Sequence, residues 1–343
     1  MVLRKIRQLI RQDLAMDLGT ANTLIYFEGE GIVLNEPTAI AMSLESAEVL
    51  ATGFEAKKYL GRTPEGIIAL RPLKEGVIRD FGAASMLIQD FLKRVEFHRG
   101  VAAPRLVICI PSNITQVEKR TVLEAAYEAG VKKVYLLEET MAAAIGAGMP
   151  VFDSRPVAVL DIGGGTTEFA LITEGGYRVC ETIRLAGDVF DEAIVQWFRY
   201  KHHLDIGLNS AEKIKWKAGA VTKAFSEGNK KILVSGKDRL RQTPLSIEVE
   251  AQEVAEALAE PVTAIRNFVI RFLSALPVSE RAALEQQGVT VTGGGALIAG
   301  LPEWLSTQTS VKFSLAEEPL TTVVMGAGIA LENFKEFEPV FVN

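Results

Sequence analysis

Residues 159–176 read VLDIGGGTTEFALITEGG, and residues 15–31 read AMDLGTANTLIYFEGEG. In each stretch an apolar run leads into an aspartate, an aliphatic residue and a glycine, and small polar residues then precede a second apolar run. This order is typical of a β-hairpin, in which two strands flank a tight turn. The repetition predicts two similar halves that face each other. The corresponding positions, 144 residues apart, are Asp17 and Asp161, Gly19 and Gly163, and Thr23 and Thr167.

The small residues of the two turns are suited to binding a polyphosphate. Because glycine has no Cβ atom, backbone N–H groups at such a turn can approach a phosphate closely. Threonine hydroxyls in both turns would add hydrogen-bond donors. We therefore predict that the two turns hold phosphates from two sides. The predicted phosphate-binding residues are Gly19, Thr20, Ala21, Asn22, Thr23, Gly163, Gly164, Gly165 and Thr166.

An aspartate precedes each turn, and a carboxylate does not itself bind a phosphate, because the two negative charges repel. Asp17 and Asp161 beside a polyphosphate make chemical sense if a divalent cation lies between, bound directly or through water. We therefore predict that these two aspartates serve a Mg²⁺ site.

A third glycine turn lies in TGGGALIAGL at residues 292–301, after a predicted strand and before a predicted helix. This position suits a nucleoside. A lone glycine turn is more often only a tight turn, but two matched aspartate hairpins followed by a third turn argue against that interpretation. The sequence has neither the P-loop motif nor the Rossmann glycine motif, which excludes both of those nucleotide sites. The predicted nucleoside-binding residues here are Gly293, Gly294, Gly295, Ala296 and Leu297.

Buried strands alternate with helices in the first half, which predicts an α/β fold. Thr115 and Glu118 have the spacing of a capping box, and Gly130 is a predicted helix end. Residues 149–156 contain two prolines and predict the boundary between the halves. The predicted elements are strands at 106–111 and 131–137 and helices at 115–130 and 141–148.

The second half begins with two predicted helices that have polar N-caps. Asp188 is the predicted cap of a helix at 187–203, and Ser210 is the predicted cap of a helix at 210–220. Residues 224–244 are polar and rich in glycine and lysine, which indicates a surface excursion.

The remaining pattern is helical apart from one strand. An amphipathic stretch at 251–276 predicts a long helix that Pro261 breaks. A strand, the third glycine turn and a helix follow at 289–306, and small residues at 321–334 predict a closing helix.

Composition and charge exclude several classes of protein. Hydrophobic residues make up 48% of the 343 residues and charged residues 23%, which excludes a disordered or fibrous chain. No apolar run reaches the length of a membrane span, and the N-terminus lacks a secretory signal. Two cysteines and three histidines form no clustered metal motif, and isolated Cys109 and Cys180 are typical of a reduced, cytosolic protein. The net charge of −6 argues against binding to nucleic acid.

The chain resembles the bacterial actin family MreB, within the actin/hexokinase/heat-shock-chaperone ATPase superfamily. The resemblance covers residues 13–334. It implies an actin-like fold with four subdomains around a nucleotide cleft, ATP or ADP with Mg²⁺ as ligands, and ATP hydrolysis coupled to polymerisation. The segments that carry it are DLGTANTLIY (17–26), GIVLNEP (31–37), LGRTP (60–64), RPLKEGVIRDF (71–81), MAAAIGAG (141–148), DIGGGTTE (161–168), GDVFDEAI (187–194), AEKIK (211–215) and TGGGALIAGL (292–301).

The resemblance also implies a division of the chain. Residues 13–149 would form the first lobe, with a small subdomain at about 33–75. Residues 150–320 would form the second lobe, with a small subdomain at about 184–248. A C-terminal helix and tail at 321–343 would return to the first lobe.

Two catalytic roles follow from the resemblance. Glu139 corresponds to the family's catalytic glutamate, and Thr167 corresponds to a threonine that helps to orient water. A carboxylate at a strand end can polarise a water for attack on a phosphate. Judged by the residues alone, Glu138 and Glu139 also fit a solvated strand end. Thr140 replaces the proline that the family usually has, which puts the rate of hydrolysis in doubt.

The nucleoside would lie against a further set of residues. Glu212 and Lys215 lie three residues apart on one helix face and correspond to positions that hold the adenosine. Gly187 and Asp188 correspond to a turn that faces the ribose. The chain departs from the family at residues 216–219, where Trp-Lys-Ala-Gly replaces the usual acid followed by Ile-Gly. Without the resemblance, Lys215 also fits an ordinary surface lysine.

Residues 1–12 carry four basic residues and no acid. On a helical wheel the apolar side chains share one face and the cations fill the rest, which is typical of a helix in a membrane interface. Many copies in a filament would multiply weak binding by one helix. A helix docked on the body or a disordered tip fits the same pattern. Residues 96–103, with Phe97 and Val101, lie where the family has a membrane-inserting loop. The predicted membrane residues are Val2, Leu3, Ile6, Leu9 and Ile10.

The function that we expect is that of an ATP-hydrolysing bacterial actin. By resemblance, it forms homopolymer filaments on the anionic inner face of the cytoplasmic membrane. There it organises cell-wall elongation and rod shape with membrane proteins of the elongation machinery. Two alternatives stay open: a specialised bacterial actin with weak hydrolysis and no wall role, and a small-molecule kinase of the same fold.

Overall fold

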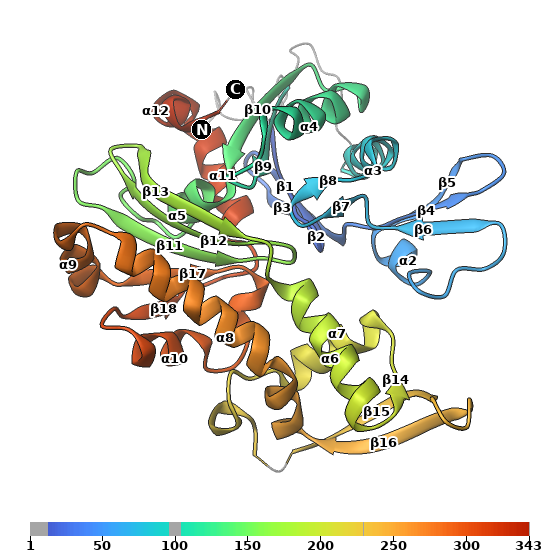
Figure 1. Ribbon diagram of the computed structural model, residues 1–343. Coiled ribbons are helices and arrows are strands. Elements are labelled where there is room, and N and C mark those ends of the chain that lie inside the picture. The colour runs from blue at the N-terminus through green and yellow to red at the C-terminus, as the bar shows by residue number, and fades with distance from the viewer. Residues whose placement is uncertain (1–12, 96–103, 229, 343) are drawn as a thin grey trace.

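The computed structural model describes residues 13–95, 104–228 and 230–342, and within them two five-stranded sheets form the centre of the molecule (Figure 1). The first sheet has the strand order β10-β9-β1-β2-β3, and the second has the order β13-β12-β11-β17-β18. The strand bounds are β1 (Leu14–Leu18), β2 (Asn22–Phe27), β3 (Gly31–Pro37), β9 (Arg105–Ile110), β10 (Lys133–Glu138), β11 (Val157–Ile162), β12 (Thr167–Thr173), β13 (Gly176–Ile183), β17 (Val289–Thr292) and β18 (Phe313–Leu315).

The two sheets repeat one topology down to the register of the hairpins. In each sheet two successive hairpins make three antiparallel strands. A later strand then pairs in parallel with the first strand, and a further strand pairs in parallel with that one. Asp17 pairs with Leu24 across the first hairpin, and Asp161 pairs with Glu168 across the second. Each pair lies at corresponding positions of the repeat. The predicted α/β class with two similar halves is confirmed.

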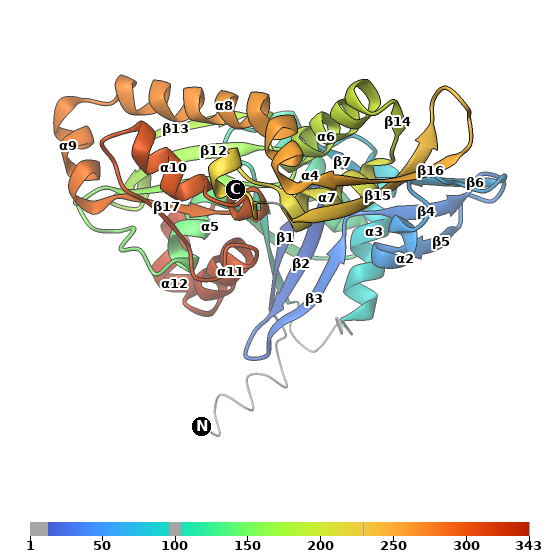
Figure 2. The ribbon, with the colours of Figure 1, turned by 90° about the horizontal axis from the view of Figure 1, so that it is seen from below.

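A smaller sheet accompanies each large one (Figures 1 and 2). We use "first lobe" for the first large sheet with β5-β4-β6 and α2, and "second lobe" for the second large sheet with β14-β15-β16, α6 and α7. A short ribbon, β7-β8, also lies in the first lobe. The bounds are β4 (Ile40–Ser43), β5 (Val49–Thr52), β6 (Ile67–Leu70), β7 (Leu73–Lys74), β8 (Val77–Ile78), β14 (Leu204–Asp205), β15 (Lys231–Asp238) and β16 (Pro244–Glu250).

Helices cover both faces of the large sheets. Helices α3 and α4 pack on one face of the first sheet, and α6, α8 and α10 pack on one face of the second. Helices α5 and α11 lie between the sheets, where one apolar cluster joins Ala15 of the first to Val159 of the second. The bounds are α2 (Gly53–Lys57), α3 (Phe81–Arg94), α4 (Gln116–Glu128), α5 (Glu139–Gly146), α6 (Gly187–Lys201), α7 (Leu208–Ala218), α8 (Ala251–Ala275), α9 (Val278–Gln287), α10 (Leu301–Gln308), α11 (Thr322–Glu332) and α12 (Phe334–Phe337), with short 3₁₀ helices at η1 (Lys223–Phe225), η2 (Gly294–Leu297) and η3 (Glu338–Val340).

The local signals of the first half are confirmed. Thr115 and Glu118 form the predicted capping box at the start of α4, because each side chain accepts a hydrogen bond from the other residue's backbone N–H. Gly130 follows the end of α4 with a φ of 94°, a conformation that glycine adopts without strain.

Pro261 does not break the long helix, so that prediction is wrong. Helix α8 continues through it from Ala251 to Ala275. A proline inside a helix removes one backbone hydrogen bond and costs about 3 kcal/mol. Pro261 is itself buried, and the same face of α8 buries large side chains such as Phe268 and Phe272. Each of these contributes roughly 1.5–3 kcal/mol by leaving water, which offsets the cost.

Two predicted N-caps are also wrong, and the predicted surface excursion lies at the surface but contains a strand. Asp188 lies in the first turn of α6, behind the N-cap Ala186, and its carboxylate pairs with Arg71 instead. Helix α7 starts at Leu208, which places Ser210 inside its first turn. Within 224–244, residues 231–238 form β15, which pairs along its length with β16 because alternate side chains are buried.

The helix pair between the sheets gives a test of packing. A Cβ atom at Gly326 in α11 would lie 1.8 Å from the backbone oxygen of Ala142 in α5. We expect Gly326→Ala to lower the free energy of unfolding by about 1–3 kcal/mol or more, because a backbone must shift. Gly82→Ala in α3 is the control, since its nearest atom would lie 3.7 Å away and alanine favours helix. Urea unfolding measures the stability of both variants. If Gly326→Ala were as stable as Gly82→Ala, the expectation would be wrong.

Among the described residues, no helix is long and apolar enough to cross a membrane. The predicted membrane helix at residues 1–12 and the predicted membrane loop at 96–103 lie outside the described residues.

Candidate functional site

A cavity of about 490 Å³ lies between the lobes, where the two hairpin turns and the third glycine turn meet. This volume is within the range of small-molecule sites. Most of the residues predicted from the sequence line it. These are Asp17, Gly19, Thr20, Ala21, Asn22, Glu139, Asp161, Gly163, Gly164, Gly165, Thr166, Gly187, Asp188, Glu212, Lys215, Gly293, Gly294, Gly295 and Leu297.

The two hairpin turns lie against each other. A Cβ atom at Gly164 would lie 2.8 Å from the Cβ of Ala21, so only glycine allows this approach. The backbone N–H groups of Gly187 and Asp188, at the start of α6, donate to the carbonyl oxygens of Gly163 and Gly164. The start of α6 is therefore fixed to the second turn. Peptide groups of both lobes face one cavity, as a ligand held from two sides requires.

Asp161 is buried beside these turns, and Asp17 is half-buried. Burial raises the pKa of Asp17 to about 7. Burial, together with the Asp17 carboxylate, raises the pKa of Asp161 to about 7. The Oδ1 atom of Asp161 is buried and has no hydrogen-bond partner. Two carboxylates that raise each other's energy, one with an unsatisfied oxygen, fit a divalent cation.

The side chains of the described residues do not by themselves complete such a cation site. Among the described residues, no group of three or more His, Cys, Asp or Glu side chains is placed to hold a metal ion. Mg²⁺ prefers six oxygen ligands and usually takes several from water and from substrate phosphates. Asp17 and Asp161 therefore fit Mg²⁺ that arrives with a polyphosphate.

Glu139 is the first residue of α5, directly after strand β10, and its side chain is 9% exposed. Burial raises its pKa well above the usual range, and the carboxylates of Glu168, Asp17 and Asp161 add to this effect. A carboxylate with a raised pKa at the floor of a cavity is a better proton acceptor than an exposed one.

Thr140, the second residue of α5, has a hydrogen-bonded hydroxyl group. Its Oγ1 atom lies 2.8 Å from Ser112 Oγ and 3.0 Å from the Tyr177 hydroxyl oxygen. Ser112 in turn donates its backbone N–H to Glu168, which also accepts from Thr182. Ser112 follows β9 of the first lobe, and the other partners lie on β12 and β13 of the second. Thr140 thus ties the start of α5 to both lobes.

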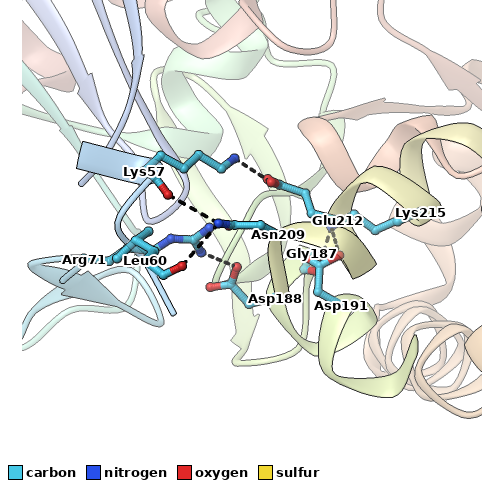
Figure 3. Close-up of polar contacts among 9 residues, drawn as sticks. All are labelled: Lys57, Leu60, Arg71, Gly187, Asp188, Asp191, Asn209, Glu212 and Lys215. Atoms are coloured by element: carbon cyan, nitrogen blue, oxygen red, sulfur yellow. Dashed lines mark hydrogen bonds and ion pairs between the residues drawn. The ribbon is translucent and has the colours of Figure 1, made fainter. Parts of the chain in front are cut away.

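Side chains of both lobes meet beside the end of the cavity that Glu212 and Lys215 line (Figure 3). Lys215 Nζ lies 3.0 Å from Asp191 Oδ1 and donates to the carbonyl oxygen of Gly187 at 2.9 Å. This contact joins α7 to the start of α6. Burial raises the pKa of Asp191 to about 6, although Lys215 opposes the shift.

The two other carboxylates there pair with cations of the first lobe (Figure 3). Glu212 Oε2 lies 2.5 Å from Lys57 Nζ, and Asp188 Oδ1 lies 2.9 Å from Arg71 Nη1. Neither cation belongs to a motif that the sequence analysis used for the site. Glu212 and Asp188, which line this end of the cavity, are thus each paired with a cation of the opposite lobe.

The third glycine turn closes the cavity beside Asp161. Gly293 has a φ of 84°, and a Cβ atom there would lie 2.4 Å from the carbonyl oxygen of Ile162. Only glycine is compatible with this position. Apolar side chains continue the wall from the turn, which suits the flat face of a base. They are Leu297, Ile298, Pro319, Leu320 and Trp216.

Three predicted residues do not line the cavity. Thr23 is fully buried, and its hydroxyl is hydrogen-bonded to that of Thr38 at 2.8 Å. Thr167 is also fully buried and donates to the carbonyl oxygen of Leu185 at 2.6 Å. Ala296 packs into the core of the second lobe. These positions support the turns from behind, and the role predicted for Thr167 stays a prediction.

Known proteins match this chain over nearly its whole length. The family model described as MreB/Mbl protein matches residues 11–339. The cell shape-determining protein MreB of Escherichia coli K12 is 42% identical over 336 residues, which are 96% of this chain and 96% of that protein. The cell shape-determining protein Mbl of Bacillus subtilis 168 is 42% identical over 323 residues, which are 94% of this chain and 96% of that protein.

Solved structures match as well. The crystal structure of MreB5 of Spiroplasma citri bound to ADP has a TM-score of 0.89 and 30% identity, and it covers 95% of this chain and 98% of its own. The same protein bound to AMPPNP has a TM-score of 0.87.

Proposed function

Because this chain belongs to the MreB/Mbl protein family, we propose that it is an actin-like cytoskeletal ATPase whose nucleotide lies in the cavity between the lobes. The observation that carries this proposal is the contact of two matched hairpin turns, each preceded by an aspartate that lines the same cavity. The phosphates lie between the turns, and the nucleoside lies toward Glu212, Lys215 and the third glycine turn.

Asp17 and Asp161 would hold the Mg²⁺, directly or through water, and the bound ion would neutralise charge on the phosphates. Backbone N–H groups of both turns orient the triphosphate. Glu139 accepts a proton from the water that attacks the terminal phosphate. Because the charge of this reaction spreads over phosphate oxygens, positioning and charge neutralisation supply most of the catalysis.

The larger assembly is also part of the proposal. The lobes span about 13–149 and 150–320, and residues 321–343 return to the first lobe, where α11 packs against α5 and β1. Closure of the lobes on the nucleotide favours assembly into homopolymer filaments. Residues 1–12 place these filaments on the anionic inner face of the cytoplasmic membrane, where they guide cell-wall elongation together with membrane proteins.

Sedimentation with lipid tests this function. We expect the full chain to pellet with ATP and Mg²⁺, and to pellet more completely with vesicles that contain anionic lipid. A variant without residues 1–12 is expected to form filaments in electron micrographs but to leave the vesicles. A chain that stays monomeric under all conditions and phosphorylates a small molecule would instead support the kinase alternative. Filaments without phosphate release would support the specialised actin with weak hydrolysis.

A further inference from the structure

The end of helix α2 in the first lobe contacts the start of helix α7 in the second lobe (Figure 3). Asn209 Nδ2 of α7 lies 3.3 Å from the carbonyl oxygen of Lys57 and 3.4 Å from that of Leu60. The last carbonyl groups of a helix lack partners within the helix. A side chain of the second lobe therefore caps a helix of the first.

Lys57 makes the shortest of the polar contacts drawn across this junction. Its ammonium group lies 2.5 Å from Glu212 Oε2, and the two side chains are only 17% and 10% exposed. The same ammonium lies 5.4 Å from the ring centroid of Trp216, one turn further along α7. A carboxylate that is buried to this degree needs a partner, because an unpaired buried charge is costly.

Glu212 thus has two tasks. It pairs with Lys57 of the opposite lobe, and it lines the cavity at the end where we place the nucleoside. A carboxylate has two oxygen atoms and accepts several hydrogen bonds. When Lys57 holds Oε2, the direction of the remaining lone pairs is set, and these can accept hydrogen bonds from the hydroxyl groups of a ribose.

We propose that Lys57 is a positioning residue for nucleoside recognition, which acts by orienting the Glu212 carboxylate from the opposite lobe. Because Lys57 reaches Glu212 only across the junction, recognition of the nucleoside depends on closure of the lobes, whereas the phosphate turns bind without this contact. The inference rests on the proposed function and adds to it a residue that determines specificity for the nucleoside end.

Calorimetry with two ligands tests the inference. ATP and inorganic tripolyphosphate, each with Mg²⁺, are titrated into the full chain and into Lys57→Met, Glu212→Gln and the double variant. Methionine keeps the length of the lysine stem and removes its charge. Lys58→Met is the matched control, because Lys58, which directly follows α2, is exposed and pairs with Glu55 of the same lobe.

We expect Lys57→Met to weaken ATP binding by about 10- to 100-fold, the loss that follows removal of a hydrogen bond to a charged group. Tripolyphosphate, which has no nucleoside, should bind the variant and the full chain alike. Because Lys57 acts through Glu212, the double variant should bind ATP no more weakly than Glu212→Gln does. Lys58→Met should change neither affinity.

Other results would overturn the inference. An equal loss for both ligands would mean that Lys57 supports only the fold or the closed arrangement. Additive losses in the double variant would mean that Lys57 does not act through Glu212, and unchanged ATP affinity in Lys57→Met would remove its role altogether. If the unmodified chain binds neither ligand, the proposed function fails as well, which separates that outcome from the others.

Discussion

Replacement of Glu139 by glutamine is expected to slow phosphate release from ATP by about 100- to 10,000-fold, the usual contribution of a general base. The amide cannot accept the proton of the attacking water. Binding of ATP should persist, because the phosphate turns and the nucleoside end are unchanged. The fold should persist too, since the substitution removes a carboxylate whose charge is disfavoured by burial and then by the neighbouring carboxylates of Glu168, Asp17 and Asp161.

Glu138→Gln is the matched control for this variant. Glu138 is the neighbouring residue and equally buried, at 9% exposure, but it does not line the cavity. Phosphate release is measured in single-turnover and steady-state assays under conditions in which all variants bind ATP. An equal loss in Glu138→Gln would mean that the start of α5, rather than the Glu139 carboxylate, limits the reaction.

The parts of this site that the sequence predicted are those with short local patterns. Each hairpin turn consists of seven consecutive residues. Its conformation depends on glycines that adopt backbone angles set by their immediate neighbours in the sequence. The same holds for the third glycine turn and for the capping box of Thr115 and Glu118. The sequence repeat predicted that the two turns join equivalent strands of the two halves. The structure shows these turns in contact.

Features set by packing between distant segments could not be predicted in this way. The ion pairs of Lys57 and Arg71 have no local signal, because the partners Glu212 and Asp188 lie more than a hundred residues later in the chain. A proline such as Pro261 would break an isolated helix, but burial of the apolar face of α8 keeps this helix continuous. The polar stretch before residue 245 forms β15 because β16 pairs with it.

Replacement of Asp161 by asparagine is expected to stabilise the ligand-free protein at pH 8 and to abolish its response to Mg²⁺ and ATP. Burial and Asp17 raise the pKa of Asp161 from an ordinary 3.8 to about 7. Between these values the folded chain keeps a proton that the unfolded chain has released. The free energy of unfolding therefore falls as the pH rises through this range, and the full loss is present above pH 7. The loss is on the order of 1–4 kcal/mol.

Thermal unfolding between pH 4 and pH 8 measures this effect. Without ligand, Asp161→Asn should match the unmodified chain near pH 4 and unfold several degrees higher at pH 8. With Mg²⁺ and ATP the order should reverse, because only the unmodified chain gains stability from binding. Asp153→Asn, at an exposed turn, is the control and should follow the unmodified chain throughout. If Asp161→Asn instead lowers stability at pH 8 without ligand, the Asp161 carboxylate stabilises the fold. It would then not be a charge that destabilises the ligand-free protein and serves to bind a cation. The reversal is the decisive result. If Asp161 served only the fold, Asp161→Asn would change stability by the same amount with and without Mg²⁺ and ATP.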